Sequence, residues 1–143
     1  MSAALAIAAL VLAALLAGLW QRHLGLRREA YIRSFELPVG LFAQLRKRRP
    51  GLSQKDCQLV AHALRQFFLA YLKGGRRFVA MPSQVADDLW HGVILYTKHY
   101  DRFCRKAFGR FLHHTPAAVL GGDHGDFGGG GGGGGDFGGG GDG

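Results

Sequence analysis

The sequence predicts an all-α protein with an N-terminal single transmembrane helix, a small soluble domain of three or four helices, and a disordered glycine-rich tail. Residues 1–20 contain no charged side chain, apolar residues recur at steps of three and four along the middle of the chain, and 16 of the last 23 residues are glycine. No alternating run is long enough to indicate a sheet. We expect a transmembrane anchor at residues 1–20, a juxtamembrane linker at 21–36, a helical domain at 37–120 and the tail at 121–143.

The anchor is predicted from an uncharged run at residues 3–20. As a helix this run would be about 27 Å long, just enough to cross the hydrocarbon layer, and Trp20 at its end suits the headgroup boundary. The first basic residues follow at once, at Arg22, Arg27, Arg28 and Arg33. The positive-inside rule therefore predicts a single-pass protein of the inner (cytoplasmic) membrane with its C-terminal domain in the cytoplasm. The alternative is a cleaved signal peptide, but the chain has no basic segment before the run and no good cleavage site before Gln21.

The domain that follows is strongly basic. All 18 Lys and Arg residues lie between Arg22 and Arg110, so anionic lipid headgroups are the nearest expected partner. The densest patch is the run at residues 46–49, which we interpret as a solvated helix end. Nucleic acid is an unlikely partner, because no recognised binding motif accompanies the charge. The sequence identifies neither a protein partner nor a cofactor.

The two cysteines, Cys57 and Cys104, do not form a CxxC motif. They could form one disulfide in an exported domain and would stay reduced in the cytoplasm. The predicted topology therefore favours free thiols.

The first two helices of the domain are predicted from their boundaries. A short helix is expected from about Val39 to Arg48, before Pro50. The next begins with a capping-box pattern at Ser53 and Asp56 and ends at two glycines, Gly74 and Gly75. Its apolar face comprises Cys57, Val60, Ala61, Leu64, Phe67, Phe68 and Tyr71.

A third helix is expected from near Ser83 to about Gly109, with a possible break near Lys98 and His99. Its core-facing stripe comprises Val85, Leu89, Val93, Tyr96, Tyr100, Phe103 and Ala107. At about 100° per residue these positions fall within a sector of about 80°. Phe111 and Leu112 should then fold back onto the core.

The residues most able to carry chemistry lie on and after this helix. Asp87 and His91 are four apart and share its outer face, opposite the core stripe. With His113 or His114 they could form a two-histidine-one-carboxylate metal set, which favours iron or similar ions. We favour the other interpretation, a structural polar cluster that ties down the following loop. Cys104 is interpreted as a small buried side chain and not a nucleophile, so no catalytic residue is assigned.

Five residues of this region form an ordered motif, Asp-x-x-Trp-His and then Tyr-x-x-x-Cys, at Asp87, Trp90, His91, Tyr100 and Cys104. The motif resembles the glycine-rich domain-containing protein family, especially its bacterial membrane-anchored members. The match covers roughly residues 82–116, and the glycine-rich tail also fits. One departure is Val93, because plant members tend to carry a second histidine there. The resemblance implies a domain identity but no established catalytic activity.

The functional expectation is therefore an interaction or scaffolding module at the cytoplasmic membrane surface, with no enzymatic activity assigned. The alternative is a metal-binding protein or metal-dependent enzyme that uses Asp87, His91 and His113 or His114.

Overall fold

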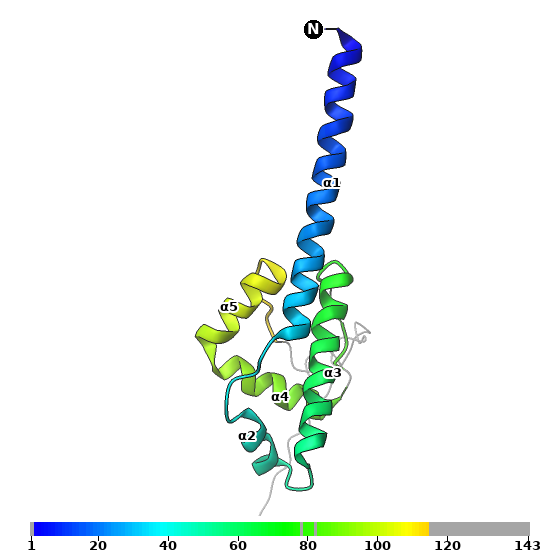
Figure 1. Cartoon of the computed structure of the whole chain (residues 1–143). Coiled ribbons are helices and arrows are strands. Elements are labelled where there is room, and N and C mark those ends of the chain that lie inside the picture. The colour runs from blue at the N-terminus through cyan, green and yellow to red at the C-terminus, as the bar shows by residue number, and fades with distance from the viewer. Residues whose placement is uncertain (1, 78, 82, 115–143) are drawn as a thin grey trace, which may run out of the picture.

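The computed structural model of the chain describes residues 2–77, 79–81 and 83–114. Within these ranges all regular structure is helical, which confirms the all-α prediction. The helices are α1 (Ala3–Ser34), α2 (Leu41–Arg48), α3 (Gln54–Lys73), α4 (Gln84–Leu95) and α5 (Thr97–Phe108). The first part of α1 projects as a long stalk from a cluster formed by the other helices (Figure 1). The expected tail at 121–143 lies outside the described residues.

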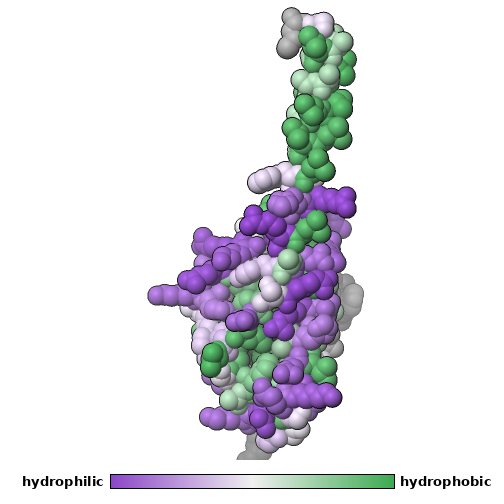
Figure 2. Space-filling view, viewed as in Figure 1, coloured by the Kyte–Doolittle hydropathy of each residue, from purple (hydrophilic) through white to green (hydrophobic). Residues whose placement is uncertain are grey.

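The stalk is the apolar part of α1. Its large apolar side chains from Leu5 to Trp20 are each more than half exposed, and Figure 2 shows them as a continuous hydrophobic column above a more hydrophilic body. The helix is long and apolar enough to cross a membrane, although a signal sequence near an N-terminus would meet the same criteria. The structure thus provides one candidate membrane span among the described residues.

The segment expected to be a juxtamembrane linker, residues 21–36, is instead helical as far as Ser34. Its end enters the core, where Ile32 and Phe35 are 0% and 5% exposed. The ring of Phe35 lies 4.1 Å from that of Phe103, measured between centroids, and the Phe35 carbonyl accepts hydrogen bonds from Arg65 Nε and Nη2 at 3.0 and 2.8 Å. The packed domain therefore begins before residue 37, inside α1.

The boundaries of α2 and α3 are close to those expected. The capping box is present: Asp56 N–H donates to Ser53 Oγ at 3.1 Å, and Ser53 N–H donates to Asp56 Oδ2 at 2.8 Å. Helix α3 ends at Lys73 with Gly74 as its C-cap. Its predicted apolar face is buried, except that Val60 is only partly covered.

The third predicted helix is two helices, α4 and α5, with a break at Tyr96, where ψ is 66°. Tyr96 is 37% exposed, so its predicted place in the core was wrong. Val85 is partly buried. The rest of the stripe is at most 1% exposed, as expected: Leu89, Val93, Tyr100, Phe103 and Ala107. Helix α5 ends at Gly109 in the left-handed conformation, with φ of 73°, and of the two following apolar residues Leu112 is buried and Phe111 is exposed.

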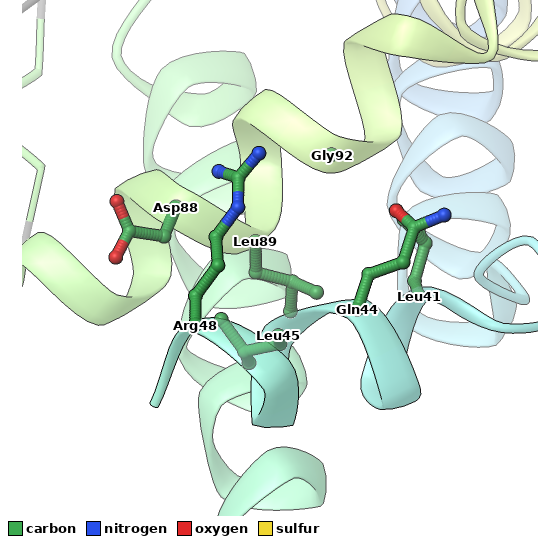
Figure 3. A pocket seen from close by; sticks show the side chains of 7 residues that line it. All are labelled: Leu41, Gln44, Leu45, Arg48, Asp88, Leu89 and Gly92. Carbon is green, nitrogen blue, oxygen red and sulfur yellow. The ribbon is translucent and has the colours of Figure 1, made fainter. Parts of the chain in front are cut away.

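Helix α2 packs closely against α4 at Gly92. A Cβ atom at this position would lie 3.0 Å from Leu41 Cδ2, so the glycine permits the approach. Figure 3 shows the small hollow between these helices, with Arg48 and Asp88 at its edge. Its cavity volume of about 10 Å³ is on the order of one water molecule. We therefore do not consider it a ligand site.

Candidate functional site

The predicted site residues meet where the chain after α5 returns to α4. His114 Nε2 lies 2.7 Å from Asp87 Oδ1, and the two side chains are 12% and 18% exposed. Asp87 is in the first turn of α4, which Ser83 caps by accepting a hydrogen bond from the Ala86 N–H. The left-handed turn at Gly109 lets the chain reverse and bring His114 to a residue 27 positions earlier.

The other two candidate histidines do not join this pair directly. The His91 ring is exposed and lies 5.7 Å from that of His114, measured between centroids. The His113 ring packs instead against Phe111, at 4.8 Å. In the described part of the chain, no group of three or more His, Cys, Asp and Glu side chains could hold a metal ion. The structure therefore brings Asp87 and His114 together, places His91 beside them and directs His113 elsewhere.

A second set of buried contacts lies next to this pair. Trp90 Nε1–H donates to the Tyr100 hydroxyl at 3.2 Å, and that hydroxyl donates to the Leu112 carbonyl at 2.6 Å. The rings of Trp90 and His114 also meet edge to face, with centroids 4.6 Å apart. Burial raises the pKa of Tyr100 well above its usual value, so the hydroxyl keeps the proton that it donates.

Cys104 lies under the same network and is fully buried as a free thiol. Burial raises its pKa, although hydrogen bonds with the Leu112 backbone and the Tyr100 hydroxyl oppose this effect. A thiol that is buried and protonated at neutral pH is a poor nucleophile. Its position in the hydrophobic core therefore suits packing and not chemistry.

Together these contacts hold the segment after α5 against α4. We call the contacts of Asp87, Trp90, Tyr100, Leu112 and His114 the α4 latch. Sequence reasoning missed the part played by Leu112, because its carbonyl contributes no side-chain signal. The latch holds Leu112 and His114 against the domain, and its polar groups already have hydrogen-bond partners within it.

The basic run at residues 46–49 is largely solvated, as expected: Arg46, Lys47 and Arg48 are exposed, and Arg49 is partly buried. Arg49 forms an ion pair of 2.7 Å with Asp88, and Arg46 Nε donates to the Leu52 carbonyl at 3.0 Å. Burial opposes the effect of this ion pair on Asp88, but hydrogen bonds from Arg49 and Gln84 hold the pKa of the carboxyl below its usual value. Arg46 and Arg49 therefore also connect the end of α2 to the following loop and to α4.

Comparison with known families gives a match to residues 27–128 by the family described as UCP032817-like. The resemblance to the glycine-rich domain-containing protein family was therefore wrong. That resemblance depended on a short motif and on a glycine-rich composition, which unrelated chains can share. No curated protein and no solved structure matches the chain.

Proposed function

The chain belongs to the UCP032817-like family, and from this premise we propose that it is a single-pass protein of the cytoplasmic membrane. Its small basic domain would act at the membrane surface as an interaction or scaffolding module. One observation carries the proposal: α1 runs without interruption from the apolar stalk into the core of the domain. A span and a domain that share one helix cannot move independently.

The contacts at the end of α1 support a fixed attachment. Ile32 is fully buried, and the ring of Tyr31 lies 5.9 Å from that of Phe103 in α5. At about 1.5 Å per residue, the helix places Ile32 only about 18 Å beyond Trp20. If Trp20 lies at the headgroup boundary, the domain is held next to the bilayer.

The distribution of charge supports a cytoplasmic location for the domain. Arg22, Arg27 and Arg28 follow the apolar segment directly, and such residues tend to remain in the cytoplasm. Hydrophilic side chains also gather around the base of the stalk (Figure 2). Lys and Arg side chains near an anionic leaflet each contribute roughly 1 kcal/mol of attraction, within a Debye length of about 8 Å.

The cysteines agree with a reducing compartment. Cys57 in α3 and Cys104 in α5 are buried and unpaired with one another. Exported small domains often use such pairs as disulfides. Free thiols are therefore expected of a cytoplasmic domain.

Reporter fusions test the proposed topology. Green fluorescent protein and alkaline phosphatase are fused separately to the C-terminus of the full chain in a bacterial host. We expect fluorescence, an inactive phosphatase and an uncut chain in carbonate-washed membranes. An active phosphatase, or a shortened chain released from the membranes, would contradict the proposal.

A matched pair of variants tests the role of charge in this topology. Replacing Arg22 and Arg27 with glutamine should lower the fluorescent fraction, because both lie within the region that the positive-inside rule counts. Replacing Lys47 and Lys98 with glutamine removes the same charge from the body of the domain and should leave that fraction unchanged. Equal effects of the two pairs would contradict the positive-inside argument.

A further inference from the structure

A groove of about 430 Å³ lies between α1 and α3, directly after the apolar segment. Four cationic side chains line it (Arg22, Arg28, Lys73 and Arg76), with one carboxylate, that of Glu29. Its volume falls within the range of about 300–1,000 Å³ that is common for small-molecule sites. None of the residues that line the groove belongs to the α4 latch.

The single carboxylate is already engaged. Glu29 Oε1 forms ion pairs with Arg33 at 2.7 Å and with Lys73 at 3.1 Å. Within the described part of the chain, Arg22 and Arg28 form no ion pair. The positive charge of Arg76 repels that of Arg28. An anion placed between these guanidinium groups would relieve their repulsion.

Arg76 is held in position at a conformational cost. Its φ of 61° is the only positive value of a non-glycine residue in the described ranges, and L-residues other than Asn and Asp rarely adopt this conformation. Its N–H donates to the Tyr71 carbonyl at 2.9 Å, and its own carbonyl accepts from Arg110 Nη2 at 2.8 Å. Arg76 Nε donates to the Phe108 carbonyl at 2.7 Å, so the planar guanidinium is pre-oriented.

The groove also has an apolar side. Leu24 and Leu72 line it together with the cations, and Leu24 lies four residues beyond Trp20. Under the proposed function this places the groove at the headgroup level of the cytoplasmic leaflet. A free phosphate would leave the apolar lining exposed to water, whereas the glycerol and first methylenes of a lipid would cover it.

We propose that this groove binds the phosphate headgroup of an anionic phospholipid from the adjacent leaflet. The proposal rests on the proposed function, because it requires the domain to lie at the membrane surface. Guanidinium groups match phosphate oxygens in a planar, two-bond geometry, and Arg28 and Arg76 would make these contacts. The bound lipid would then fasten α3 to the base of the stalk.

The test is a lipid titration of the full chain in neutral detergent. The midpoint of thermal unfolding is measured with added phosphatidylglycerol, phosphatidylcholine or glycerol 1-phosphate. We expect only phosphatidylglycerol to raise the midpoint. The double variant Arg28→Gln/Arg76→Gly should weaken apparent phosphatidylglycerol binding by about 25-fold, or about fivefold for each cation removed. Glycine suits the left-handed backbone at this position, and Arg28→Gln alone serves if the double variant does not fold.

A control removes two cations at the far end of the domain. Lys47 is in the last turn of α2 and Lys55 in the first turn of α3, whereas the groove is lined by Leu72 and Lys73 at the other end of α3. In Figure 1 the end of α2 lies beside the start of α3, away from the base of the stalk. Helix α3 is about 30 Å long, which is several Debye lengths. Lys47→Gln/Lys55→Gln should therefore change binding less than twofold. Equal losses in both double variants, or equal shifts with glycerol 1-phosphate and with the lipid, would overturn the proposal. The reporter fusions can succeed when this titration fails, so the failure of the groove is distinct from the failure of the topology.

Discussion

Replacing Tyr100 with phenylalanine removes a single oxygen atom, yet that atom takes part in two buried hydrogen bonds. It accepts from Trp90 Nε1 at 3.2 Å and donates to the Leu112 carbonyl at 2.6 Å. Tyr100 is 1% exposed, so water cannot easily replace either partner. The aromatic ring remains, and packing should be conserved.

The expected loss follows from these two partners. A buried donor or acceptor that loses its partner costs about 1–3 kcal/mol. With one donor and one acceptor affected, we expect Tyr100→Phe to lower the free energy of unfolding by about 2–6 kcal/mol. Tyr96→Phe is the matched control: Tyr96 is 37% exposed, and its change should stay below about 0.5 kcal/mol.

The assay is urea unfolding of the full chain in non-ionic detergent. The chain has two tryptophans, so a Trp20→Phe background leaves Trp90, beside the lost oxygen, as the only source of tryptophan fluorescence. The midpoint should fall while the slope stays constant, because the surface exposed on unfolding is unchanged. If Tyr100→Phe costs no more than Tyr96→Phe, the latch does not stabilise the domain.

Three further predictions concern single contacts. Gly109→Ala should lower the free energy of unfolding by about 1–2 kcal/mol, since φ is +73° and the new Cβ would lie 2.7 Å from Arg28 Nη2; unchanged thermal stability would contradict this. The lowered pKa of Asp88 means that its pair with Arg49 stabilises the fold above the unfolded-state pKa of about 3.9, and this stability is lost as pH falls through the folded-state pKa. Asp88→Asn should therefore flatten the acid side of the stability profile, by less than about 1 kcal/mol because Arg49 is more than a third exposed; an unaltered profile argues against it. His114→Ala should speed amide exchange in the segment that follows α5, because a contact to α4 is lost; equal exchange would show that this contact does not hold the segment.

Local signals predicted α3 well. The capping box at Ser53 and the glycine after Lys73 act through neighbouring backbone groups, so they can be recognised without knowing the rest of the fold. The spacing of apolar residues likewise predicted which side chains of α4 and α5 face the core, such as Leu89 and Phe103.

The break between α4 and α5 was expected only as a possibility near Lys98 and His99, and the structure places it at Tyr96. The spacing of apolar residues could not locate it. Apolar periodicity indicates which side of a helix is buried, but not whether the next turn continues along the same axis. The residue at the break is a tyrosine, and not the glycine or proline that would mark a helix end in the sequence. The chain bends there so that both helices cover one core. The continuation of α1 beyond Trp20 could have been predicted from the sequence. Helix-forming residues follow Trp20, and no proline occurs before Pro38.

The sequence indicated that Asp87 could meet a histidine after Gly109, but it left His113 and His114 as alternatives. The choice of His114 over His113 depends on the path of residues 111–114, which the burial of Leu112 and the Tyr100 hydroxyl determine. The cationic groove also joins residues far apart in sequence, such as Arg28 and Arg76. Only the packing of α1 against α3 brings them together.

The proposed function requires α1 to be one rigid connection between the membrane and the domain. Hydrogen–deuterium exchange of the full chain in lipid bilayers tests this connection at residues 21–34. We predict that these amides are protected as strongly as those of α3, because they form part of a continuous helix whose end is buried. Exchange at the rate of an unstructured chain, while α3 remains protected, would contradict the account.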